Sequence, residues 1–161
     1  MTLCLNHLII VGLPEFLKDF ESRVVGDAPR LFPADPDDEL HSILNFHSAV
    51  PVPDGLLNPP QEKPAKAWMW EHWGCTGYRY DDVRLERPDG SLLYHFETYV
   101  MPPIPWVTAI SAMFPTLQFT LDYFKCLTDH WGTFKAVNGI VHEAEEWAHD
   151  ERDTGPAHAP R

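Results

Sequence analysis

The chain has 161 residues, of which 44% are hydrophobic and 12% aromatic, so it is long enough for one globular domain and is not a disordered protein. It contains no apolar run of about 20 residues that could span a membrane, and no secretory signal pattern. Its formal net charge of −12 repels phosphate groups, which disfavours direct binding of DNA or RNA.

Charge and cysteine content also bear on the setting of the protein. The 24 acidic residues against 12 basic ones indicate either simple solubility or docking onto a basic partner surface. The three cysteines, Cys4, Cys75 and Cys126, form no C-x-x-C pair. We therefore expect a cytoplasmic protein with reduced thiols, no disulfide and no contact with a membrane.

The first part of the chain predicts one strand, one helix and a second strand. Residues 3–11 have apolar side chains on both sides of an extended segment, which is typical of a central strand with both faces mostly covered. Residues 15–24 show helical apolar spacing after Pro14. A breaker-rich connector, residues 26–39, then ends in an acidic run, and residues 40–48 alternate as a strand does.

The middle of the chain is rich in proline and tryptophan. Residues 51–64 carry five prolines and predict an exposed loop that lies over the body. Residues 66–73 predict one or two helical turns, and they contain Trp68, Trp70 and Trp73. After Gly74 and Gly77, a short strand at residues 83–87 is expected to form a hairpin with the next one through Pro88-Asp89-Gly90.

The second part again predicts strand, helix and strand. Residues 91–99 place Tyr94 and Phe96 on one face and His95 and Glu97 on the other. Prolines at 102, 103 and 105 end this strand and start a helix over residues 106–114, and residues 117–124 alternate as a strand. Asn138-Gly139 predicts a C-terminal β-hairpin, and residues 145–152 are expected to continue as a helix.

This order of elements is that of the ferredoxin-like split β-α-β sandwich, an α+β fold. Here we expect one domain over residues 1–147, with an aromatic insertion at about residues 51–80 and a C-terminal β-hairpin. Residues 148–161 predict a flexible acidic tail.

Several short motifs resemble one protein family. They are Asn6-His7-Leu8, Asn45-Phe46 before Pro51-Val52-Pro53, Trp70 to Tyr80, Phe96-Glu97-Thr98, Pro102-Pro103-Ile104-Pro105, and Phe114-Pro115-Thr116-Leu117-Gln118-Phe119. Together they resemble the YubB-type ferredoxin-like proteins of phages and conjugative plasmids. The resemblance implies an origin on a mobile element and a small accessory role in the cytoplasm of a bacterial host, and it supplies no catalytic residue.

The aromatic insertion has two interpretations. Trp68, Trp70, Trp73 and Tyr78 could form a lid over the sheet, because tryptophan buries much area and needs only one hydrogen-bond partner. They could instead form a partly exposed platform for a partner protein or a stacked ligand. The acidic residues Asp35, Asp37, Asp38 and Glu39 would then steer a basic partner onto it.

Two groups of polar residues are candidate chemical sites. His142, Glu145, Glu146 and His149 would share one helix face with a metal-ligand spacing, although a solvated helix end explains them better. His7, His95 and Glu97 should meet on one sheet face, where an acid–base pair would still lack a nucleophile.

We therefore predict a protein that is not an enzyme and holds no metal or cofactor, because no catalytic or phosphate-binding motif is present. The main hypothesis is a phage- or plasmid-encoded accessory protein that binds a host protein, as an acidic inhibitor of a defence enzyme or another nucleic-acid enzyme. The alternatives are a small-molecule, nucleotide-like binding protein that uses the Trp-rich insertion, and a metal-dependent hydrolase.

Overall fold

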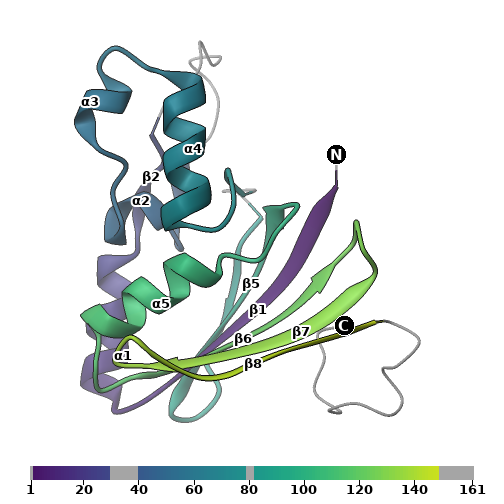
Figure 1. Ribbon diagram of the computed structural model, residues 1–161. Coiled ribbons are helices and arrows are strands. Elements are labelled where there is room, and N and C mark those ends of the chain that lie inside the picture. The colour runs from purple at the N-terminus through teal and green to yellow at the C-terminus, as the bar shows by residue number, and fades with distance from the viewer. Residues whose placement is uncertain (1, 30–39, 79–81, 149–161) are drawn as a thin grey trace.

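A curved antiparallel sheet forms the body of the protein, and helices gather on one of its faces (Figure 1). The computed structural model describes residues 2–29, 40–78 and 82–148. The sheet has six strands, which follow one another in space as β4 (Arg84–Glu86), β5 (Ser91–Tyr99), β1 (Leu3–Val11), β6 (Gln118–Lys125), β7 (His130–Val137) and β8 (Ile140–Ala148). The protein is thus an α+β protein.

Strand β1 lies in the middle of the sheet, between β5 and β6, as its apolar composition predicts. Only one of its faces is fully covered: Leu8 and Ile10 are buried, whereas Leu5 and Ile9 are partly exposed. The expectation that both faces are mostly covered was wrong. The reason is that helices α1 (Pro14–Arg23) and α5 (Ile104–Met113) both lie on the same side of the sheet (Figure 1).

The core lies between these two helices and the sheet. The ring of Phe20 from α1 makes edge-to-face contacts with Tyr94, Phe114 and Phe119, at centroid distances of 6.2, 5.2 and 5.6 Å. Edge-to-face pairs of this kind add to the free energy gained from burial alone. The predicted helix over residues 106–114 is confirmed as α5, which begins two residues earlier and buries Trp106 and Ile110.

The middle of the chain is more helical than the sequence predicts. The expected strand over residues 40–48 is limited to β3 (His41–Ser42), which pairs with β2 (Gly26–Asp27). Residues 51–64 form more than a loop, because they contain α3 (Asp54–Leu57) and the start of α4 (Glu62–His72). In Figure 1, α3 and α4 extend from one end of the α1–α5 layer.

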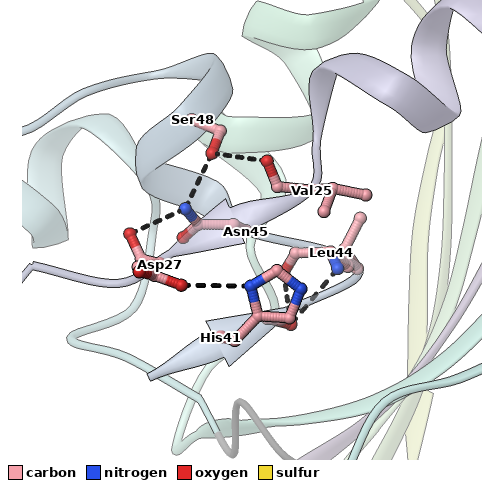
Figure 2. Close-up of polar contacts among 7 residues, drawn as sticks. Val25, Asp27, His41, Leu44, Asn45 and Ser48 are labelled. Carbon is pink, nitrogen blue, oxygen red and sulfur yellow. Dashed lines mark hydrogen bonds and ion pairs between the residues drawn. The ribbon is translucent and has the colours of Figure 1, made fainter. Parts of the chain in front are cut away.

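Asn45 explains why the extended segment stops after β3 (Figure 2). Its Nδ2 donates hydrogen bonds to the carbonyl oxygen of Asp27 at 3.0 Å and to Ser48 Oγ at 2.7 Å, and Ser48 Oγ donates to the Val25 carbonyl at 3.3 Å. Asn45 thereby ties β2 to the short helix α2 (Phe46–Ala49), which follows directly. Side-chain bonds of this kind compete with a strand ladder.

At the C-terminal end, the predicted hairpin is confirmed as β7 and β8, joined at Asn138-Gly139. The helix expected from residue 145 was wrong as far as the structure describes it, because β8 runs on to Ala148. The register with β7 places Glu145 opposite Thr133 and Trp147 opposite Trp131, and the Glu143–Lys135 ion pair of 3.0 Å holds the strand to the sheet. Most of the predicted tail lies outside the described residues.

Candidate binding site on the open sheet face

The face of the sheet opposite α1 and α5, here named the open face, carries a row of polar side chains across five strands. Strand register places Arg84 beside His95, His95 beside His7, His7 beside Asp122 and Asp122 beside Thr133. Directly opposed residues in an antiparallel sheet have Cβ atoms about 5 Å apart. The five side chains are therefore neighbours, although they come from strands far apart in the sequence.

His7 and His95 form the centre of this row. Their ring centroids are 4.4 Å apart, and the rings meet edge to face with an interplanar angle of 79°. Burial lowers the pKa of His7, and the nearby His95 and Arg84 lower that pKa further, whereas Glu86 opposes the change. His7 is consequently a neutral imidazole at neutral pH, with one donor and one acceptor nitrogen.

His95 has an unusual hydrogen-bonding state. Its Nε2 lies 3.3 Å from Glu86 Oε1, which is within ion-pair distance, but the contact does not have hydrogen-bond geometry. Both ring nitrogens are buried, and neither has a hydrogen-bond partner among the described residues. A buried polar group left unpaired costs roughly 1–3 kcal/mol. His95 would therefore gain from a ligand or a water molecule that bonds to its ring.

A hollow of about 170 Å³ opens beside the two imidazoles. Its charged lining comes from Asp82, Arg84 and Glu97, and Leu5 adds an apolar wall. We name this site, with His7 and His95, the histidine hollow. No Ser, Thr or Cys lies among the lining residues that the structure describes, so these residues can bind a polar group or move a proton but include no hydroxyl or thiol nucleophile.

Asp122 lies on the other side of His7 in this row of polar side chains. Its side chain is buried, and its Oδ1 accepts a hydrogen bond from the Thr133 hydroxyl at 2.8 Å. A buried carboxylate needs such partners, because an unpaired buried charge is costly. No group of three or more His, Cys, Asp or Glu side chains within residues 2–29, 40–78 and 82–148 is arranged to hold a metal ion.

The sequence prediction that His7, His95 and Glu97 meet on one sheet face is confirmed, because all three line the hollow. Sequence reasoning missed Asp82 and Arg84. The predicted hairpin between residues 83–87 and residues 91–99 was the available signal, since its register sets which β4 side chain lies beside His95.

Two of the predicted partner contacts, Trp73 and Tyr78, are core residues. Trp73 Nε1 donates a hydrogen bond to the Val50 carbonyl at 2.9 Å, and Tyr78 Oη donates one to the Leu44 carbonyl at 2.6 Å. Both rings contact Phe46. Their surface role is corrected accordingly: in this conformation they stabilise the segment around α2 and do not reach a partner.

The other two tryptophans of the insertion do not form a common platform. Trp68 is partly buried and stacks on His72 at a centroid distance of 4.4 Å, whereas Trp70 is 45% exposed. Two residues on a helix are separated by about 200° of rotation. Trp68 and Trp70 therefore lie on different sides of α4, and Trp70 is the only one of the four aromatics that is largely exposed.

The remaining predicted positions divide into two groups. The steering acids Asp35, Asp37, Asp38 and Glu39 lie outside the described residues. His142, Glu145 and Glu146 lie in strand β8 and not on a helix, and His149 is not described. Because side chains alternate along a strand, Glu145 and Glu146 point to opposite faces, so the helical metal-ligand arrangement was wrong.

The comparisons with known proteins concern the fold. No family model matches the sequence, and no curated protein matches it. The structure is similar to the crystal structure of protein api92 from Yersinia pseudotuberculosis, assigned to the family DUF1281, with a TM-score of 0.65 and 11% sequence identity. The likeness covers 92% of this chain and 98% of that one. At this level of identity it bears on the fold alone.

Proposed function

We propose that this protein is a phage- or plasmid-encoded accessory protein that binds a host protein through the open face of its sheet. The observation that carries the proposal is the histidine hollow, a concave polar site on the face away from α1 and α5. The imidazole nitrogens of His95, buried without a hydrogen bond among the described residues, favour an external group at that site.

Within this proposal, the fold is a ferredoxin-like sandwich extended by a hairpin. The spatial order β4-β5-β1-β6 supports it, because it has the two crossovers of a split β-α-β unit, with α1 after β1 and α5 between β5 and β6. Strands β7 and β8 would be an addition at the β6 edge. The YubB-type resemblance of the sequence motifs supports both this fold and an origin on a mobile element.

The partner we propose is a defence enzyme or another nucleic-acid enzyme of the host, located in the bacterial cytoplasm. The net charge of −12 supports this, because an acidic surface competes for a site that holds phosphates. Trp70 on α4 is proposed as a second contact, since it is exposed. Asp35, Asp37, Asp38 and Glu39 are proposed as steering charges, whose effect would weaken as salt rises.

Affinity capture from bacterial cells, compared among three charge reversals, tests the proposal. Glu97→Lys changes the hollow, Glu71→Lys changes the exposed side of α4 near Trp70, and Glu15→Lys changes the first turn of α1 on the other side of the sheet. We expect the captured host protein to bind Glu97→Lys at least about tenfold more weakly. Glu15→Lys should bind as the unchanged protein does.

Two outcomes would contradict the proposal in different ways. Loss of binding with Glu71→Lys and retention with Glu97→Lys would move the contact surface to α4. Capture of no host protein above background would remove the protein-binding function itself.

A small-molecule binding protein is the second candidate, and the unpaired ring nitrogens of His95 favour it as well. The Trp-rich insertion is a poorer site for such a ligand, because Trp73 and Tyr78 fill their surroundings. Native mass spectrometry of the purified protein would detect a retained metabolite, and elemental analysis of the same sample tests the metal-dependent hydrolase.

A further inference from the structure

We propose that the outer edge of strand β8 accepts an extended, basic segment of another protein as an additional strand of the sheet. This inference goes beyond the proposed function, because it concerns the edge of the sheet and not the histidine hollow. Three properties of β8 lead to it: its free backbone groups, its length and its charges.

The backbone of β8 offers a row of hydrogen-bonding groups. The strand is the last one in the sheet, with β7 on one side and no described strand on the other (Figure 1). In an antiparallel ladder, every second residue points its N–H and C=O groups away from the neighbouring strand. Along residues 140–147 these outward groups form no hydrogen bond with the described part of the chain. An extended peptide can bond to such a row by adding a strand.

The two edges of the sheet differ in length. The opposite edge strand, β4, has three residues, and a short edge strand is one way in which proteins avoid pairing with other chains. Strand β8 has nine residues and contains no lysine, arginine or proline. A register shift leaves His142 as an extra residue, so residues 143–148 form the regular part, about as long as an average strand.

The side chains of this regular part favour a basic occupant. Glu143 forms an ion pair with Lys135 at 3.0 Å, and Glu146 forms one with Lys125. Glu145 is exposed and forms no ion pair with another described residue. A lysine or arginine directly opposite Glu145 on an added strand would have its Cβ atom about 5 Å away, which suits an ion pair. The net charge of −12 attracts a basic segment as well.

The same glutamates oppose pairing between two copies of β8. Two copies related by a twofold axis would pair antiparallel around one centre. Every register centred at or between residues 144 and 146 places two glutamates directly opposite each other, because residues 143, 145 and 146 are all glutamate. Like charges in opposed positions destabilise a sheet. The occupant is therefore a basic segment and not a second copy.

Backbone amide nuclear magnetic resonance on the full, isotope-labelled chain tests this inference. The probe is a blocked peptide of the same length as β8, with alternating lysine and valine. One control alternates lysine and proline, which keeps the charge but removes ladder donors, and the other alternates glutamate and valine, which keeps the donors but reverses the charge.

We expect the lysine–valine peptide to shift the amide signals of residues 140–147 with a Kd on the order of 0.1–1 mM, and to leave those of β4 unchanged. At about ten times this Kd, every second amide of β8, the set that points away from β7, should exchange with solvent about tenfold more slowly. Both control peptides should bind at least about tenfold more weakly.

A pair of variants separates the edge from general attraction to an acidic protein. Glu145→Gln should weaken binding of the lysine–valine peptide about threefold or more. Glu15→Gln removes the same charge from the first turn of α1 and should leave binding unchanged.

Four results would overturn the proposal. They are equal binding of the lysine–proline peptide, equal binding of the glutamate–valine peptide, shifts of β8 without slower exchange of its outward amides, and no binding at about 5 mM lysine–valine peptide. Slower exchange of the same amides at rising protein concentration, without any peptide, would show that a second copy occupies the edge and would overturn it too.

Discussion

At the scale of single residues, two of the sequence motifs are explained by one contact. Gly74, which follows Trp73, has a φ of +85°, and a Cβ built on it would collide with Pro105 Cδ and lie 3.1 Å from the Pro102 carbonyl oxygen. The Trp-Gly pair and the proline-rich start of α5 thus touch each other. Any side chain at residue 74 would separate α4 from α5.

Three glycine-to-alanine variants distinguish the two reasons why residue 74 is glycine, the positive φ and the close contact with Pro105. Gly55→Ala has open space and an ordinary helical position, so we expect it to change the free energy of unfolding by less than about 1 kcal/mol, towards greater stability. Gly90→Ala has open space but a φ of +71°, which costs about 1–2 kcal/mol. Gly74→Ala adds the collision with Pro105 and should cost about 1–3 kcal/mol more.

Urea unfolding of the three variants measures this order. If Gly74→Ala were no less stable than Gly90→Ala, the close contact between residue 74 and Pro105 would be contradicted, because the two variants share the unfavourable φ.

His47 links the stability of the protein to pH. Its Nδ1 accepts a hydrogen bond from the Val52 N–H at 3.0 Å, and burial lowers its pKa below the usual value. Above about pH 6.5 both folded and unfolded states are neutral at this residue; below it the unfolded state takes up the proton first, so stability falls as pH falls. His7, whose pKa is also lowered, acts in the same direction.

The variant His47→Asn keeps a hydrogen-bond acceptor but does not titrate. We expect its melting temperature to fall less than that of the unchanged protein between pH 7.5 and pH 5.5. Parallel curves for the two proteins would show that His47 does not contribute to the pH dependence.

At the scale of elements, periodic segments were predictable and segments shaped by tertiary contacts were not. Strand β5, helix α5 and the β7–β8 hairpin follow from alternation, helical spacing and turn residues. The β3–α2 region alternates in the same way, yet Asn45 closes it into a turn through bonds to residues 27 and 48. Only the folded structure brings residues 27, 45 and 48 together, so the spacing of apolar residues along the sequence could not reveal these hydrogen bonds.

The Asn45 contacts can be tested by removing one amide group. Asn45→Ala should lower the free energy of unfolding by about 1–3 kcal/mol, because it removes the two part-buried hydrogen bonds from the buried Asn45 amide to the Asp27 carbonyl and to Ser48 Oγ. Asn58→Ala is the matched control: its amide bonds to Asp54 at 2.7 Å on the surface, so its loss should cost less than about 1 kcal/mol. Equal costs for the two variants would contradict a structural role of Asn45 in joining β2 to α2.

At the scale of the whole molecule, part of the candidate site was predictable from the sequence. The alternation of β1 and β5 places His7, His95 and Glu97 on one face, and the observed register brings them together. The side chain that β4 contributes to the candidate site depends on the register of the β4–β5 hairpin, which the sequence does not specify. Trp73 and Tyr78 were misassigned because their burial depends on contacts with Phe46 and the carbonyls near it.

The arrangement of the helices and the net charge of the molecule both bear on the open face. No helix in the described part of the chain is long and apolar enough to cross a membrane. Helices α1 and α5 lie on one face of the sheet, and the polar row with its hollow lies on the other, in a protein with a net charge of −12. These properties are consistent with our proposal that the open face meets a basic partner surface.

Histidine footprinting of the protein with its captured partner tests that central claim most directly. Diethyl pyrocarbonate modifies accessible imidazoles, and mass spectrometry then compares each histidine with and without the partner. Our account predicts that the partner slows modification of His7, the partly exposed imidazole of the hollow, and leaves His72 on α4 unchanged. Protection of His72 with no protection of His7 would contradict it.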